Sequence, residues 1–219
     1  MPTFITSDDG CRIYYETHGF GTGKPALVLI NGTAQTTLNW LPTAKRLISK
    51  FQVVLYDCRG QGGSDLGSSP LGLDTHSRDL AALLVQLNIQ DVRLTGLSYG
   101  GRIALEVARQ YPEKIAKVMC VSTSNAPNPR REALVASWME VLRLGGVAAL
   151  GWSMVPFVFG ERFLKRNYRY LAAAVQALAE RNRPETISAY LLAMTANSSN
   201  VTPSPLHCPS FFLSGTDDP

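Results

Sequence analysis

The chain has 219 residues, of which 45% are hydrophobic and 17% are charged. This composition excludes a disordered chain and a nucleic-acid-binding tail. No apolar run reaches the roughly 20 residues that a membrane-spanning helix requires, and residues 1–9 lack the basic and apolar regions of a signal peptide. Four widely spaced cysteines have neither metal-ligand nor CxxC spacing: Cys11, Cys58, Cys120 and Cys208. We therefore expect reduced thiols, no metal or cofactor, and a cytoplasmic protein without an integral membrane segment.

The net charge of +4 is unevenly distributed. Residues 125–200 contain nine basic and five acidic side chains, while the rest of the chain is balanced. All of the excess positive charge therefore belongs to one segment, and this segment also differs in its pattern.

Up to residue 122 the chain alternates strand-like runs with helical patterns. The predicted strands are Thr3–Thr6, Cys11–His18, Pro25–Ile30, Phe51–Tyr56, Val92–Leu97 and Ile115–Ser122. The last four are rich in Val, Leu and Ile, which is typical of strands covered on both faces. Helical spacing of apolar residues predicts helices around residues 40–48, 80–87 and 103–111. This order predicts an α/β fold, a three-layer α/β/α sandwich with a mostly parallel sheet.

Residues 125–202 break the alternation. They predict helices over Arg130–Leu144, Glu161–Arg181 and Pro184–Asn197, with an apolar, glycine-containing connection over residues 145–160. A last strand is predicted over Ser210–Ser214. We interpret the helical segment as a cap inserted into the sheet domain, which gives a core at 1–124, a cap at 125–202 and a return to the core at 203–219.

One motif is typical of a catalytic site. Gly96-Leu97-Ser98-Tyr99-Gly100 is a G-x-S-x-G sequence between a predicted strand and a predicted helix. Its glycines leave room for a sharp turn around Ser98. The helix N-terminus that follows favours developing negative charge through its dipole and free N–H groups. An ordinary Gly/Ser turn can have the same letters, but the strand–turn–helix context favours a nucleophile.

At this point the chain resembles the α/β-hydrolase superfamily over nearly its whole length. Residues 27–33 match the family strand that ends in His-Gly-x, with Asn31 in place of the usual His. Residues 57–65 match its D-x-R-G-x-G-x-S segment, which a helix containing Asp79-Leu80 follows. The elbow and Tyr111-Pro112-Glu113-Lys114-Ile115 come next, so four motifs stand in the family order. The chain is most similar to the capped esterases and enol-lactonases.

The resemblance implies roles for individual residues. Ser98 would attack a carbonyl carbon and form an acyl-enzyme. The backbone N–H groups of Thr33 and Tyr99 would hold the oxyanion, and Asn31 would shape the substrate-binding loop beside them. In the family the triad acid follows the late strand, where Asp218 is in register and Asp217 is the second choice. An Asp-rich surface turn is the alternative interpretation of both.

A base for the serine is harder to find, because the family order is Ser, acid, then His. His18 and His207 are expected at the end of the sheet opposite the nucleophile, while His76 begins a helix on the correct side. None of the three is a convincing base. We interpret the family's last strand, its histidine and its final helix as lying beyond Pro219. Ser210–Ser214 then becomes an exposed apolar edge, which a covering partner or a second copy would protect.

Two features of the cap segment each have more than one interpretation. Residues 144–160 are uncharged and include Trp152, Phe157 and Phe159, which suits a buried cap core, the wall of an acyl pocket or a membrane-surface contact. Four cations follow on one helix face: Arg162, Lys165, Arg166 and Arg169. They are either a solvated outer face or a site that attracts an anionic substrate such as a carboxylated lactone or an acyl thioester.

These observations predict a cofactor-free serine hydrolase that cleaves a small-molecule carboxylic ester, lactone or thioester under a helical cap. The family's epoxide hydrolases and dehalogenases have a carboxylate where this chain has Ser98, so those reactions fit less well. The alternative function is a catalytically inactive protein of the same fold that binds acyl ligands.

Overall fold

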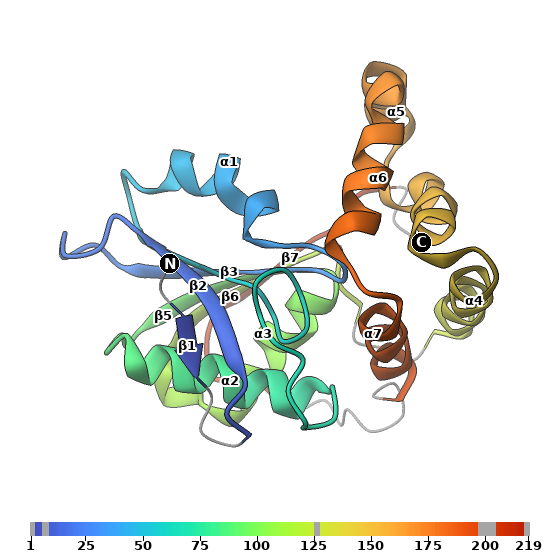
Figure 1. Ribbon diagram of the computed structural model, residues 1–219. Helices are drawn as coiled ribbons and strands as arrows, with labels where there is room; N and C mark the ends of the chain where they lie inside the picture. The colour runs from blue at the N-terminus through green and yellow to red at the C-terminus, as the bar shows by residue number, and fades with distance from the viewer. Residues whose placement is uncertain (1–2, 6–8, 125–127, 197–204, 217–219) are drawn as a thin grey trace.

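The computed structural model describes residues 3–5, 9–124, 128–196 and 205–216. Their strands form one sheet in the order β1-β2-β4-β3-β5-β6-β7 (Figure 1). The bounds are β1 Thr3–Ile5, β2 Arg12–His18, β3 Ala26–Ile30, β4 Gln52–Tyr56, β5 Val92–Leu97, β6 Ile115–Val121 and β7 Ser210–Leu213. β1 pairs antiparallel with β2 and β2 pairs antiparallel with β4, whereas β3 to β7 are parallel. The predicted mostly parallel sheet is confirmed.

Helices cover both faces of the sheet centre. α1 (Thr37–Leu47) lies on one face, and α2 (Leu73–Gln86) and α3 (Tyr99–Gln110) lie on the other (Figure 1). Side chains of β3 alternate between the two layers, because Leu27 and Leu29 join the cluster beneath α1 while Val28 and Ile30 join the larger core. All five residues of β3 are buried. Its uninterrupted apolar run is therefore explained by burial on two sides.

The strands further along the sheet are covered less completely. β5 and β6 alternate mainly between buried and half-buried residues, so the prediction of two covered faces is wrong for them within the described residues. The reason is that α1 covers its face of the sheet mainly over β3 and β4, whose side chains it contacts. β7 is an edge strand, and its three apolar residues are 47–59% exposed: Phe211, Phe212 and Leu213.

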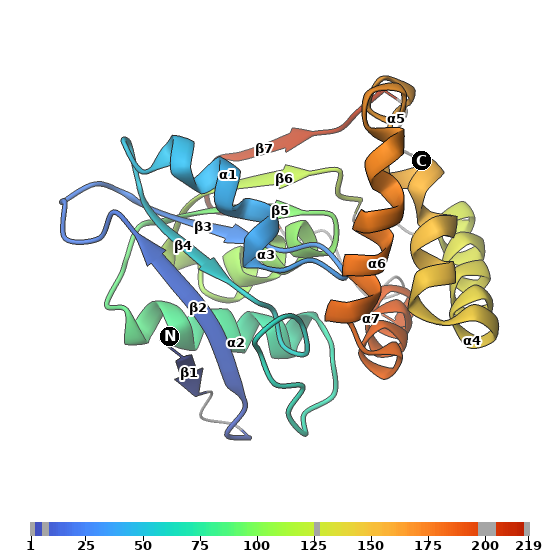
Figure 2. The ribbon, with the colours of Figure 1, turned by 45° about the horizontal axis from the view of Figure 1, so that its top comes forward.

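Between β6 and β7 the described chain is helical. It forms α4 (Pro129–Val158), α5 (Glu161–Asn167), the short 3₁₀ helix η2 (Tyr168–Tyr170), α6 (Leu171–Arg181) and α7 (Pro184–Ala196), here called the inserted helices. Figure 2 shows them on the side toward which the parallel strands point. α4 and α7 contribute Val135, Leu142, Val147, Leu150, Ile187 and Leu191 to a separate hydrophobic cluster.

The predicted helix end at Leu144 agrees with a break in α4 at Gly146, but the predicted non-helical connection over residues 145–160 is wrong, because α4 is helical again after the break, up to Val158. The Asn128 side chain caps the start of α4 by accepting hydrogen bonds from the N–H groups of Arg130 and Arg131. Gly146 interrupts the helical geometry with φ 70° and ψ −169°, which divides α4 into two halves. By length and composition α4 is apolar enough to cross a membrane, although 28% of its apolar window is buried within the molecule.

Candidate active site

The G-x-S-x-G sequence forms a sharp turn between β5 and α3. Ser98 has φ 54° and ψ −116°, a backbone conformation that a non-glycine residue adopts only when its surroundings impose it. Its N–H donates to the Val121 carbonyl (2.8 Å), and its carbonyl accepts from the Gly101 N–H (3.0 Å) and the Thr123 hydroxyl (3.1 Å). These bonds fix the turn against β6. Ser98 itself is exposed at the end of β5.

The glycines of the motif are required by close backbone contacts. A Cβ atom at Gly96 would overlap the carbonyl of Gly100. A Cβ atom at Gly100 would lie 2.5 Å from the carbonyl oxygens of Ile30 and Asn31, which belong to the end of β3. The expectation that the glycines leave room for the turn is confirmed, and α3 approaches β3 closely for the same reason.

The loop after β3 lies beside this turn. A Cβ atom at Gly32 would be 3.2 Å from the Leu97 carbonyl, so this loop and the end of β5 are in contact. The Gly32 N–H donates to the Gln35 side-chain carbonyl (2.9 Å). Among the described residues, neither the Thr33 N–H nor the Tyr99 N–H has a hydrogen-bond acceptor. Two amides able to donate are thus placed at the carboxyl ends of neighbouring strands.

Asn31 supports that loop from inside. It is 1% exposed, and its side-chain amide donates to the Tyr56 carbonyl (3.0 Å) and to Asp57 (3.4 Å). Asp57 also accepts from the N–H groups of Thr37 (2.7 Å) and Gly63 (2.8 Å). Burial raises the pKa of Asp57, and these donors oppose the rise. Asn31 therefore fixes the ends of β3 and β4, which fits the loop-shaping role.

A buried ion network holds the D-x-R-G loop. Arg59 forms two hydrogen bonds with Asp79 of α2 (2.7 and 2.8 Å) and one with Asp9 (2.5 Å), and its side chain is 1% exposed. The Arg59 guanidinium keeps the pKa of Asp9 well below its usual range. The motif thus secures the loop next to the site.

Two contacts between the sheet layers and the inserted helices were not predicted. The Tyr190 hydroxyl of α7 donates to the Arg59 carbonyl (2.7 Å). The Asn182 side chain, between α6 and α7, donates to the Ala34 carbonyl (3.4 Å) in the loop after β3. Both bonds join residues more than a hundred positions apart, and no local motif marks either partner.

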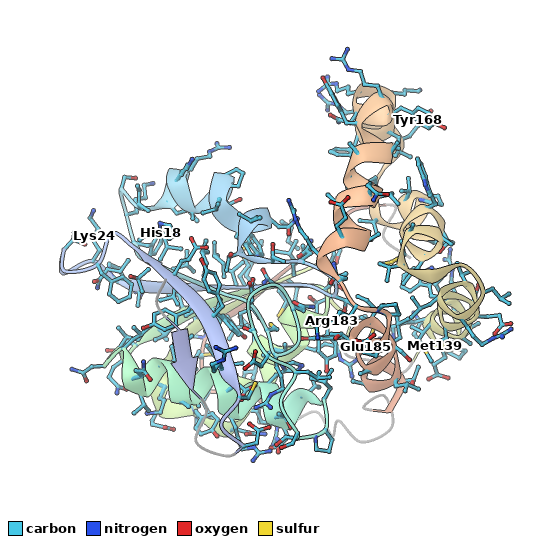
Figure 3. The ribbon with its side chains drawn as sticks, in the orientation of Figure 1. His18, Lys24, Met139, Tyr168, Arg183 and Glu185 are labelled. Carbon is cyan, nitrogen blue, oxygen red and sulfur yellow. The ribbon has the colours of Figure 1, made fainter. Side chains whose placement is uncertain are left out.

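Two histidines lie where they were expected, far from Ser98. His18 pairs with Val53 at the amino end of β4 and contacts Glu16 (3.2 Å). Figure 3 shows His18 on the side of the sheet that faces away from Glu185 of the inserted helices. His207 is exposed and precedes β7, which runs parallel to β6, so it also lies at the amino edge of the sheet.

His76 is enclosed in an aromatic cluster beneath the turn. Its ring stacks on Tyr190 (centroid distance 5.4 Å) and meets the edge of Tyr99 (5.7 Å). Burial, reinforced by the nearby Arg59 charge, lowers the pKa of His76 to about 3. A general base must accept a proton, and this environment disfavours the protonated ring. No hydrogen bond joins it to Ser98 within the described residues, so the structure gives no support to His76 as the base.

The predicted acid, Asp218, and its alternative, Asp217, lie outside the described residues. β7 nevertheless leaves the sheet at the correct edge. Leu213 is level with Val121 on β6, and Val121 is level with Leu97 on β5. Residues after β7 therefore continue from the edge at which Ser98 stands.

The apolar residues predicted to bind substrate lie on or just after α4. Trp152 and Phe157 are 45% and 41% exposed, and Phe159 is half-buried. The Phe157 ring meets Trp138 edge-on (6.1 Å), and the Phe159 ring stacks on Phe163 of α5 (4.4 Å).

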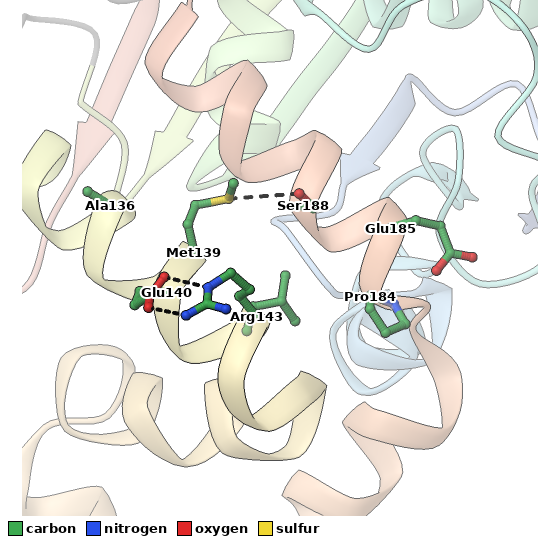
Figure 4. A pocket seen from close by; sticks show the side chains of 8 residues that line it. Ala136, Met139, Glu140, Arg143, Pro184, Glu185 and Ser188 are labelled. Atoms are coloured by element: carbon green, nitrogen blue, oxygen red, sulfur yellow. Dashed lines mark hydrogen bonds and ion pairs between the residues drawn. The ribbon is translucent and has the colours of Figure 1, made fainter.

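A groove of about 560 Å³ lies between α4 and α7 (Figure 4). Its lining residues are Ala136, Met139, Glu140, Leu142, Arg143, Pro184, Glu185 and Ser188. None of them belongs to the turn at Ser98 or to the loop after β3. The groove is therefore separate from the candidate active site.

Comparisons with known proteins agree with this geometry. The family model of the alpha/beta hydrolase fold matches residues 25–151. A protein of Caulobacter sp. (strain K31) that bears the name carbamate hydrolase RutD is 24% identical over 209 residues, 94% of this chain and 78% of that protein. The RutD protein of Caulobacter segnis is 26% identical over 164 residues, and the match spans 74% of this chain but 61% of that relative.

Two solved structures extend the comparison to the whole described fold. The enol-lactonase from Burkholderia xenovorans LB400 superposes with a TM-score of 0.85 at 23% identity, covering 98% of this chain and 81% of that chain. A thermophilic esterase from Thermogutta terrifontis superposes with a TM-score of 0.81 at 25% identity, covering 98% and 79%.

Proposed function

Because the chain belongs to the alpha/beta hydrolase fold family, we propose that it is a serine hydrolase that forms an acyl-enzyme on Ser98. The substrate would be a carboxylic ester, a lactone or a thioester. The observation that carries this proposal is the backbone of Ser98, which has a positive φ at the end of β5 and leaves the residue exposed. Strain of this kind persists where the surrounding structure imposes it, and it is frequent at reactive residues.

The proposed reaction has two halves. The Ser98 hydroxyl oxygen bonds to the carbonyl carbon and gives its proton to a base, and the bond to the leaving alcohol or thiol then breaks as that group takes the proton. In the second half, water gives a proton to the base and bonds to the acyl carbon; the bond to the Ser98 oxygen then breaks as that oxygen takes the proton, and the acid is released. The N–H groups of Thr33 and Tyr99 would hold the oxyanion in both halves.

The base and the acid complete the proposal. Asp218 would orient a histidine that follows it in the whole protein, since the family order is Ser, acid, then His. The poor fit of His18, His76 and His207 supports a base from outside these three. A strand beyond the edge of β7, from the same chain or from a covering partner or second copy, would also shield Phe211 and Phe212.

The inserted helices would act as a cap, consistent with a division into residues 1–124, 125–202 and 203–219. Asn182 and Tyr190 tie them to the loops beside Ser98. The apolar side chains of Trp152, Phe157 and Phe159 would then meet the acyl part of the substrate. The names of the RutD relatives support hydrolysis at a carbonyl generally, and a carbamate would be attacked in the same manner.

A fluorophosphonate probe tests the proposal, because it reacts covalently with an activated serine. We expect labelling of the purified whole protein, abolished by Ser98→Ala and kept by Ser68→Ala, which changes an exposed serine outside the site. Ester hydrolysis should fall by roughly 10⁴-fold or more in Ser98→Ala. A folded whole protein that the probe does not label would overturn the proposal and favour the alternative, an inactive protein that binds acyl ligands.

A further inference from the structure

The outer end of the inserted helices carries a group of exposed cations. α5 and η2 stand at the free end of these helices, and α6 leads back from them to the sheet layers (Figure 1). Four exposed cations lie here, and we call residues 162–170 the basic tip: Arg162, Lys165, Arg166 and Arg169. The expectation that all four share one helix face is wrong, because α5 ends at Asn167 and Arg169 lies on η2. Glu161 is the single acidic residue between positions 144 and 179.

Local contacts neutralise little of this charge. Glu161 pairs with Lys165 (2.6 Å) on an exposed surface. The Arg169 guanidinium lies over the Tyr170 ring at 4.7 Å. Arg162 and Arg166 form no ion pair within the described residues. A solvent-facing positive surface therefore remains.

Aromatic side chains border the cations and are also exposed. Phe163 is 44% exposed, Tyr168 71% and Tyr170 54%. Phe163 belongs to α5, whereas Tyr168 and Tyr170 belong to η2. Figure 3 shows Tyr168 at the outermost end of the inserted helices. The stacking of Phe163 on Phe159 (4.4 Å) keeps that ring beside the cations instead of burying it.

The basic tip adjoins an uncharged surface. Residues 144–160 contain no charged side chain, and Val158 at the end of α4 is 56% exposed. Only 28% of the apolar window of α4 is buried within the molecule. Cations, aromatic rings and an apolar border thus meet at one projecting end of the protein.

Different partners would use these features differently. A second copy presenting the same surface would place four cations against four cations, which disfavours self-association there. An acidic protein would satisfy the cations but would not require the exposed rings. Anionic lipid headgroups attract Lys and Arg, while Tyr and Phe favour the boundary between headgroups and acyl chains.

We propose that the basic tip docks the protein reversibly on the surface of an anionic lipid bilayer. Docking uses the outside of the inserted helices and none of the groups at Ser98. The inference therefore goes beyond the proposed hydrolase and does not depend on it.

Sedimentation with vesicles tests the docking directly. The purified whole protein should cosediment with vesicles of phosphatidylcholine and phosphatidylglycerol, should bind much less to pure phosphatidylcholine, and should be released by added salt. Replacing Arg162, Lys165, Arg166 and Arg169 together with Gln should weaken binding at least tenfold, because each cation near such a surface contributes about fivefold in affinity. Phe163→Ser with Tyr168→Ser should also weaken binding, with the salt dependence retained.

A matched variant separates docking from general positive charge. Lys45, Arg46, Lys50 and Lys117 are exposed cations of the sheet layers, and replacing all four with Gln removes the same charge elsewhere. This control should bind anionic vesicles as the wild type does. Equal losses in the two Gln variants, absence of vesicle binding, or a dimer that the basic-tip variant dissociates without lipid would each overturn the proposal. Fluorophosphonate labelling of Ser98 should be the same in both variants. Labelling therefore tests the hydrolase proposal, and vesicle binding tests the docking proposal independently of it.

Discussion

The central parallel strand β3 and the inserted helix α4 bury their apolar residues to very different degrees. All five residues of β3 are buried, because helices cover both faces of the sheet centre. In α4, 28% of an 18-residue apolar window is buried, because these helices have neighbours on one side and solvent on the other. The two environments suit different kinds of function. Fixed backbone geometry such as that of Ser98 needs dense packing, whereas a docking surface needs exposed side chains.

Glycine substitutions test that difference most strongly. Gly100→Ala puts a Cβ atom 2.5 Å from two backbone carbonyls, so α3 must move away from β3. We expect the free energy of unfolding to fall by about 3–4 kcal/mol and labelling of Ser98 to be lost. Gly160→Ala, at the start of α5, meets open space and should cost less than about 1 kcal/mol. Urea denaturation measures both, and equal effects would contradict the contrast in packing.

Ion pairs provide the next test. Asp79→Asn leaves the buried Arg59 guanidinium with an incomplete set of anionic partners, and the free energy of unfolding should fall by about 2–3 kcal/mol. Glu140→Gln breaks an ion pair with Arg143 on the solvent side of α4, where water replaces the lost bonds. That variant should have the same denaturation midpoint as the wild type. A stability loss in Glu140→Gln as large as that in Asp79→Asn would refute the argument from burial.

The sequence is informative about the two regions to different degrees. The bounds of β5 were predicted without error, because a short apolar run between turn residues has few alternatives. The break in α4 at Gly146 lies close to the predicted helix end at Leu144, but the second helical part, up to Val158, was missed, since Gly145 and Gly146 suggested an irregular connection. At the candidate site, the sharp turn at Ser98 was predicted from a local motif. The bonds from Tyr190 and Asn182 were not predicted, because they depend on how distant helices pack.

The acid sensitivity of the sheet layers should depend on His76. Burial lowers its pKa to about 3 in the folded protein, from an ordinary value of 6.5. Between these values the unfolded chain binds a proton that the folded chain does not, so stability falls as the pH drops from 6.5 toward 3. The expected slope is about 1.4 kcal/mol per pH unit. His76→Phe should flatten this dependence in urea melts at successive pH values, whereas His207→Gln, at an exposed position, should leave it unchanged.

The smallest expected effect concerns a hydrogen bond between the inserted helices and the sheet layers. Tyr190→Phe removes the hydroxyl that donates to the Arg59 carbonyl but keeps the ring, which stacks on His76 and meets Tyr99 edge to face. The free energy of unfolding should fall by about 1 kcal/mol, the usual value of one buried hydrogen bond. Tyr168→Phe removes an exposed hydroxyl from the same helical segment and should have no effect. Hydrogen exchange distinguishes two outcomes. Faster exchange confined to α7 would mean that the inserted helices detach as a unit, while faster exchange in both regions would mean that they unfold together with the sheet.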